Sequence, residues 1–103
     1  MSLAGCSYMK AAPECSKQPD LAKLAPAERS APKDASTRYA ARCKRQDYQC
    51  EISLAKNDNG EILVTVASVY PDRASGNCVP APGDQDLAVY SPTGDFVRSV
   101  MAL

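Results

Sequence analysis

The chain has 103 residues, 45% of them hydrophobic and 23% charged, with five cysteines but no histidine and no tryptophan. This length suits one domain, because two independent hydrophobic cores need a longer chain. The 12 basic and 12 acidic residues cancel, so no net charge attracts nucleic acid and we expect no nucleic-acid partner. The absence of histidine excludes Ser-His and Cys-His nucleophile pairs, histidine bases and histidine zinc sites. We therefore expect no metal and no cofactor.

The most specific short motif is Leu3-Ala4-Gly5-Cys6, followed by Ser7. It resembles the lipobox of bacterial lipoproteins, in which a signal peptidase cuts before the cysteine and that cysteine carries a lipid. The resemblance implies lipidation at Cys6, and Ser7 implies sorting to the outer membrane, so we expect a periplasmic protein held to the membrane by its lipid alone. A charged and an apolar signal region normally precede such a motif. We interpret residues 1–3 as a start introduced for expression in place of that signal, so the chain as written cannot be exported.

The other four cysteines are Cys15, Cys43, Cys50 and Cys78. An even number of cysteines in a short exported domain predicts two disulfides. The gaps between them contain 27, 6 and 27 residues, which disfavours a zinc site because zinc ligands usually come in close pairs. Of the three possible connectivities we favour Cys43–Cys50 with Cys15–Cys78.

The N-terminal third is rich in proline, with prolines at positions 13, 19, 26 and 32. Each proline removes a backbone donor and disfavours helix at the residue before it. We therefore predict a lipidation site and a Pro/Ala-rich tether over residues 1–33, and a small domain over residues 34–103. A bond from Cys15 to the domain would hold half of this tether against it.

A helix of about three turns is predicted to start near Ser30 or Asp34, which are good N-caps, with Pro32 in its first turn. Residues 35–46 have alanine, tyrosine and cysteine on one face at helical spacing. Another face carries arginines, in a half of the chain (residues 1–56) that has ten basic and six acidic residues. This face could bind anionic headgroups, wall polymers or an acidic partner, or its arginines could pair with nearby carboxylates. The arginines are Arg38, Arg42 and Arg45.

Four strands are predicted after the helix, from period-two alternation and from turn residues. They cover residues 48–55, 61–70, 87–91 and 96–103, with tight turns at 57–60 and 92–95 and a proline-rich loop at 71–85. The helix must cover one face of the sheet. The predicted fold is therefore α+β, with one amphipathic helix packed on a four-stranded antiparallel meander in two layers.

Two further groups of residues are candidate sites. The loop 71–85 is expected to be anchored by a disulfide and to present Arg73, Ser75 and Asn77 to a partner. Paired carboxylates could catalyse hydrolysis if two of them faced each other across a cleft, although aspartate beside Gly or Pro usually caps turns. The carboxylates concerned are Asp72, Asp84, Asp86 and Asp95. The tyrosines at positions 39, 48, 70 and 90 are expected to pack in the core.

These features together predict a non-catalytic, lipid-anchored periplasmic binding protein, for example an inhibitor or immunity-type module. The expected partner is another envelope or exported protein, or a cell-wall component. Two alternatives stay open, namely a small carboxylate-dependent hydrolase of the cell envelope and a purely structural envelope lipoprotein. The sequence leaves the identity of the partner and the oligomeric state open.

Overall fold

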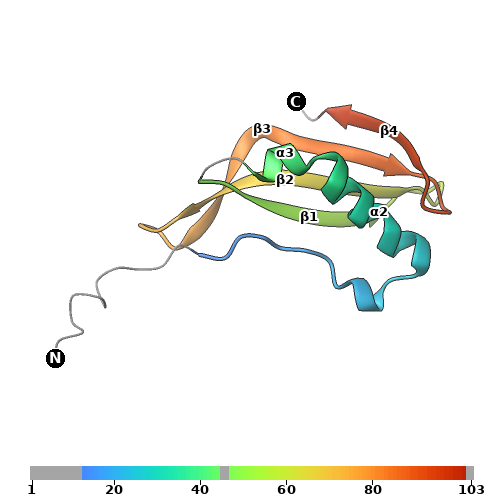
Figure 1. Cartoon of the computed structure of the whole chain (residues 1–103), viewed down its shortest axis with the longest axis horizontal. Helices are drawn as coiled ribbons and strands as arrows, with labels where there is room; N and C mark the ends of the chain where they lie inside the picture. The colour runs from blue at the N-terminus through green and yellow to red at the C-terminus, as the bar shows by residue number, and fades with distance from the viewer. Residues whose placement is uncertain (1–12, 45–46, 102–103) are drawn as a thin grey trace.

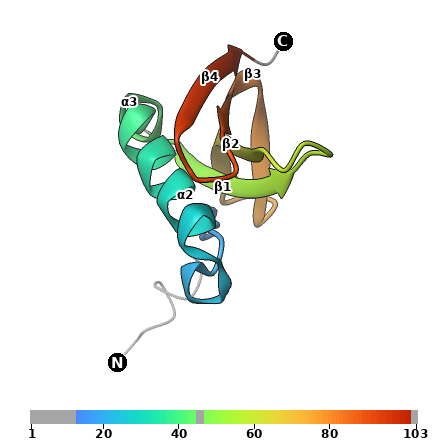
Figure 2. The same cartoon turned by 90° about the vertical axis from the view of Figure 1, so that its right-hand side faces the viewer.

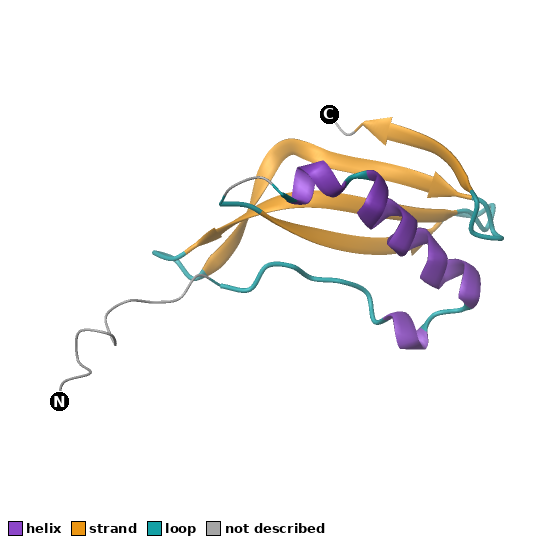
Figure 3. Cartoon of the chain, in the orientation of Figure 1, coloured by secondary structure: helices purple, strands orange, loops and turns teal. Residues whose placement is uncertain are grey.

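A computed structural model describes residues 13–44 and 47–101 of the chain. The chain forms the 3-10 helix η1 (Leu21–Lys23), helices α2 (Pro26–Arg38) and α3 (Ala40–Cys43), and strands β1 (Gln49–Lys56), β2 (Ile62–Asp72), β3 (Asn77–Tyr90) and β4 (Phe96–Met101), as Figures 1 and 3 show. The strands pair antiparallel in the order β1-β2-β3-β4. The predicted α+β class with an antiparallel sheet is therefore confirmed. Within the described residues, no helix is long and apolar enough to cross a membrane.

Helix α2 lies across one face of the sheet (Figure 2). Ala31 and Ala35 are fully buried there, and their small side chains let the helix approach the strands closely. The sheet contributes mainly β-branched residues from alternating positions, as a half-buried sheet requires. The sheet residues in this core are Cys50, Ile52, Ile62, Val64, Val66, Ala88 and Tyr90.

The helix starts earlier than predicted. Pro26 occupies its first turn, where proline lacks only a hydrogen bond that would be missing anyway. The carboxylate of Glu28 accepts a hydrogen bond from the N–H of Ala25 (3.2 Å) and caps the helix. Pro32 lies in the middle of α2 and is buried, so the packing that buries it outweighs its poor helix propensity. The predicted tether boundary at residue 33 thus falls inside α2, and the predicted helix end at residues 45–46 lies outside the described residues.

The predicted loop over residues 71–85 is wrong, because most of it is β-sheet. Strand β2 continues to Asp72 and β3 starts at Asn77. The turn between them is closed by the N–H of Gly76, which donates to the carbonyl of Asp72 (2.9 Å). Pro71 lies within this hairpin, opposite Cys78. The β2–β3 hairpin is consequently longer than predicted and extends beyond the start of β1 (Figure 1).

The two tight turns predicted at residues 57–60 and 92–95 are confirmed. The Asn57 side chain accepts hydrogen bonds from the N–H groups of Asn59 and Glu61, and Gly60 has a φ of 78°. At the other turn the N–H of Ser91 donates to the carbonyl of Asp95 (2.7 Å). The hydrogen bonds of the Asn57 side chain within the turn at residues 57–60 therefore fix the register of the β1–β2 hairpin.

The described segment before η1 runs alongside β1 (Figure 1). The N–H of Ile52 donates to the carbonyl of Lys17 (2.8 Å), so the segment covers part of the edge that β1 would otherwise leave open. This part of the predicted tether lies against the domain, as expected if Cys15 is bonded to it.

Candidate functional site

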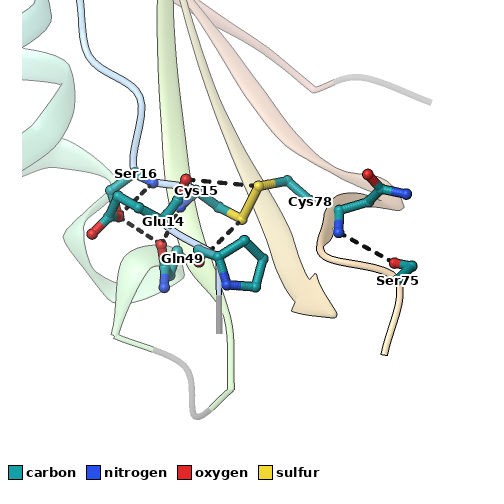
Figure 4. Close-up of a disulfide and its surroundings, with 8 residues drawn as sticks. Glu14, Cys15, Ser16, Gln49, Ser75 and Cys78 are labelled. Carbon is teal, nitrogen blue, oxygen red and sulfur yellow. Dashed lines mark hydrogen bonds between the residues drawn. A yellow bond between two sulfur atoms is a disulfide. The ribbon is translucent and has the colours of Figure 1, made fainter. Parts of the chain in front are cut away.

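Both favoured disulfides are present in the structure. The Cys43–Cys50 bond joins the last residue of α3 to β1, with Cα atoms 5.1 Å apart. The Cys15–Cys78 bond joins the N-terminal segment to β3, with Cα atoms 5.8 Å apart (Figure 4). The predicted lipid site, Cys6, lies outside the described residues.

A cleft of about 560 Å³ lies near the two disulfides, although none of the four cysteines lines it. Cys50 directly follows the residues of one wall, and Cys78 lies opposite Pro71 of the other wall in the β2–β3 ladder. Each wall is therefore held by a covalent bond to another part of the chain. We call this site the disulfide-framed cleft; it is lined by Asp47, Tyr48, Gln49, Tyr70, Pro71, Asp72 and Arg73.

The first wall, residues 47–49, lies in the short loop that the Cys43–Cys50 bond closes. Asp47 has a φ of 68°, a conformation that is rare outside glycine but that aspartate tolerates. The side-chain carbonyl of Gln49 accepts hydrogen bonds from the N–H of Cys15 (2.7 Å) and the hydroxyl of Ser16 (3.2 Å), as Figure 4 shows. These bonds orient the amide of Gln49 and connect this wall to the Cys15–Cys78 disulfide.

The second wall is the end of β2 and the turn after it. The ring of Tyr70 contacts that of Tyr48 edge to face, with centroids 6.0 Å apart. The carboxylate of Asp72 accepts hydrogen bonds from the hydroxyl of Ser75 (2.8 Å) and the N–H of Ala74 (3.2 Å). These bonds hold the pKa of Asp72 below its usual value, so Asp72 shapes the turn and stays ionised at neutral pH.

Tyr70 is 43% exposed, so the prediction that it packs in the core is wrong, whereas Tyr90 is fully buried as predicted. Simple alternation places Tyr70 on the same face as Val64 and Val66. The register shifts between residues 67 and 69, however, and two successive residues, Ser68 and Val69, are buried. The next residue, Tyr70, is therefore turned outward.

The sequence-based candidates in the predicted loop lie together at the β2–β3 turn. Arg73, Ser75 and Asn77 are all exposed there. The hydroxyl of Ser75 binds Asp72 and accepts a hydrogen bond from the N–H of Asn77 (3.2 Å; Figure 4), so of the three only Arg73 lines the cleft. Asp47 and Gln49 were not among the candidates predicted from the sequence. The feature that could have indicated them is their position just before Cys50.

Two of the three arginines of the predicted helix face have carboxylate partners in the fold. The guanidinium of Arg42 lies 2.7 Å from the carboxylate of Asp86, and both side chains are largely buried. Arg38 binds Asp34 (3.1 Å) and lies over the ring of Phe96, 3.6 Å from its centroid. Both therefore make structural contacts between a helix and the sheet, and Arg45 lies outside the described residues.

The candidate carboxylates have separate local roles. Asp86 pairs with Arg42. In the β3–β4 turn the carboxylate of Asp95 accepts a hydrogen bond from the hydroxyl of Thr93, and the N–H of Asp95 donates to the hydroxyl of Ser91. That turn lies at the opposite end of the sheet from Asp72 (Figure 1), and the side chain of Asp84 lies outside the described part. Among the described residues, no group of three or more cysteines or acids is placed to hold a metal ion.

No protein-family model, curated protein or solved structure matches this chain. The proposal for its function rests on the geometry and chemistry of the disulfide-framed cleft.

Proposed function

We propose that the protein is a non-catalytic binding module of the bacterial cell envelope and that the disulfide-framed cleft is its contact surface. The observation that carries this proposal is that each wall of one cleft lies next to a disulfide-bonded cysteine, Cys50 after Gln49 and Cys78 opposite Pro71. A surface that is rigid before binding loses little conformational entropy when a partner arrives. The local hydrogen bonds that the carboxylates of Asp72 and Asp95 accept, and the ion pair of Asp86, support a binding role rather than hydrolysis by these carboxylates.

The partner class we propose is another envelope or exported protein, or a cell-wall component. Within this class, an inhibitor or immunity-type module is one concrete version of the function. The exposed Tyr70 and Arg73 support a contact at the cleft, because tyrosine and arginine are enriched in the residues that contribute most to interfaces.

Lipidation at Cys6 would tie the cleft to the outer membrane. Only the eight residues 7–14 separate Cys6 from Cys15, which is bonded to the β2–β3 hairpin. Eight fully extended residues span at most about 29 Å, so the cleft end of the domain would be the end nearest the membrane. Expression from its own gene with a labelled fatty acid tests this step: label should enter the native chain and be lost in Cys6→Ser, and equal labelling would contradict it.

Binding at the cleft is tested by retention of the oxidised chain on washed envelope preparations. Tyr70→Ala and Asp47→Asn should each lower retention several-fold, since one removes an exposed ring and the other a charge. Asparagine tolerates the positive φ of residue 47 as aspartate does. Val97→Ala is the matched control, because Val97 is 47% exposed on β4, away from the cleft. Equal retention of all four chains would contradict the proposal and favour a purely structural lipoprotein.

A further inference from the structure

The disulfide-framed cleft combines a braced aromatic surface with polar groups of both charges. Tyr70 is 43% exposed, and its edge-to-face contact with Tyr48, at an angle of 62° between the rings, limits its rotation. The faces of aromatic rings carry partial negative charge and attract the positive edges of C–H bonds. A ligand suited to this surface has a flat array of C–H groups.

Three polar groups of the cleft make no side-chain hydrogen bond or ion pair with the described residues. Asp47 and Arg73 form no hydrogen bond or ion pair there, including with each other, and the amide nitrogen of Gln49 donates to no described residue. The cleft therefore offers one carboxylate that accepts and two planar groups that donate. Asp72 is different, because its carboxylate is already bonded to Ser75 and Ala74.

The cleft carries charges of both signs, Arg73 and the carboxylates of Asp47 and the ionised Asp72, so a strongly anionic ligand is disfavoured most and Arg73 also opposes a strongly cationic one. A strongly cationic ligand would bring its charge toward Arg73, and a strongly anionic one toward Asp47. A hydroxyl group both donates and accepts, so neighbouring hydroxyls can satisfy Asp47 and Arg73 together without an uncompensated charge. Hydrogen bonds to these charged groups are stronger than those between neutral partners.

The shape of the cleft points the same way. Asp47, Tyr70 and Arg73 are exposed, so the cleft is open rather than an enclosed apolar pocket of the kind that anchors a large side chain of a protein partner. Its volume of about 560 Å³ lies in the usual range of small-molecule sites. Both walls are fixed by disulfides, which favours a ligand that makes many weak contacts.

We infer that the disulfide-framed cleft binds a neutral oligosaccharide, with C–H groups of a sugar ring on Tyr70 and hydroxyls bonded to Asp47, Gln49 and Arg73. This inference rests on the proposed function, because it names the ligand class of the same site. It makes the cleft a glycan-binding site, so among the proposed partners it favours a cell-wall component over a protein.

The test is an amide and tyrosine-ring NMR titration of the oxidised full chain. The probes are tetrasaccharides of N-acetylglucosamine, β-linked glucose and α-linked glucose, soluble glycan strands released from bacterial cell wall, and a pool of random tripeptides. We expect a saturable shift with at least one sugar, confined to residues 47–49 and 70–73. Tyr70→Ala should weaken that binding by about tenfold, the scale of one lost aromatic contact, and Arg73→Lys should weaken it through loss of the planar fork. Val97→Ala should bind as the unchanged chain does.

Three outcomes overturn the inference: no sugar shifts the cleft, the shifts map elsewhere, or only the tripeptides shift the cleft. If envelope retention still depends on Tyr70 while every sugar fails, the ligand class is wrong and the proposed function stands. If retention is also independent of Tyr70, both are wrong. Unchanged melting temperatures of the variants confirm that the losses are local.

Discussion

Pro71 lies opposite Cys78 in the β2–β3 ladder, so the bond from Cys78 to Cys15 fixes the strand that carries Tyr70. On the facing wall, Gln49 precedes Cys50 and binds the N–H of Cys15. The two disulfides and one hydrogen bond thus connect the N-terminal segment, the α3–β1 connection and the hairpin around a single cleft. This arrangement explains why a small domain uses four cysteines at one end of its sheet.

The disulfides are predicted to contribute unequally to stability. Replacing Cys15 and Cys78 together by alanine should lower the free energy of unfolding by about 4 kcal/mol, and replacing Cys43 and Cys50 by about 2 kcal/mol, because the longer loop loses more entropy when it is closed. Their sequence separations are 63 and 7 residues. Urea unfolding of the two double variants measures this, and a larger loss in the second variant would contradict it.

The hydroxyl of Tyr90 donates to the carboxylate of Asp34 (2.6 Å) and so joins β3 to α2. Tyr90→Phe should lower the free energy of unfolding by about 1.5–3 kcal/mol, the usual contribution of a hydrogen bond to a charged group. Thermal or urea unfolding at pH 7 measures the loss. The control is Tyr39→Phe. The hydroxyl of Tyr39 bonds the exposed Ser99, so its removal should lower the free energy of unfolding less. Equal losses in the two variants would contradict a special role for the bond between Tyr90 and Asp34.

The same contact predicts a pH dependence. The hydrogen bond from Tyr90, and then Arg38, lower the pKa of Asp34 in the folded state. The stabilising contribution of Asp34 is therefore present above its unfolded-state pKa of about 3.9 and is lost as the pH falls through the lower folded-state pKa. Burial, and then the bond to Asp34, raise the pKa of Tyr90, so its contribution is lost as the pH rises above about 10. In Tyr90→Phe, the free energy of unfolding should fall less steeply with pH in both the acid and the alkaline range. Unchanged slopes would show that Asp34 and Tyr90 do not cause the pH dependence.

Of the described glycines at positions 60, 76 and 94, Gly94 is expected to tolerate a side chain least. Its φ is 95°, and an added Cβ would lie 2.7 Å from the hydroxyl of Ser30 and 3.2 Å from the Cα of Ala27. Gly94→Ala should therefore combine backbone strain of about 1–3 kcal/mol with a clash against α2. Gly76→Ala isolates the strain, because Gly76 has a φ of 74° with no atom within 4 Å of the added Cβ. Equal melting temperatures for the two variants would show that the β3–β4 turn does not pack on α2.

Arg42 and Asp86 form a largely buried ion pair between α3 and β3. Arg42→Met should lower the free energy of unfolding by about 3 kcal/mol or more, because it removes a close partner of a buried carboxylate. Adding Asp86→Leu should recover most of this loss. A loss below about 0.5 kcal/mol for Arg42→Met would contradict a stabilising role for this ion pair.

Several parts of the fold could be predicted because their determinants are local. The turn at residues 57–60 and the alternation of β1 follow from short-range spacing. The even cysteine count predicts two disulfides but allows three connectivities, one of which joins residues 63 apart. The sequence predicts Pro32 in the first turn of the helix, because helix propensity does not include the tertiary contacts that bury Pro32 in the middle of α2. The extension of β2 and β3 was missed because prolines usually end strands, although Pro71 is accommodated opposite Cys78.

The cleft itself could not be predicted from the sequence. Its two walls are separated by about twenty residues and meet only through the β1–β2 pairing. The exposure of Tyr70 depends on the register shift after Ala67, which an alternating pattern does not reveal. The sequence shows where the cysteines lie along the chain, but only the folded structure shows that both disulfides form near the same cleft.

The most direct test of the cleft as a contact surface is photo-crosslinking in cells of the organism that carries the gene. A photoreactive phenylalanine analogue replaces Tyr70 in one strain and the equally exposed Val97 in another. We predict a discrete adduct with an envelope component from position 70, suppressed by Asp47→Asn in the same chain, and none from position 97. Adducts from position 97 alone, or from neither position, would contradict the assignment of the disulfide-framed cleft as the binding site.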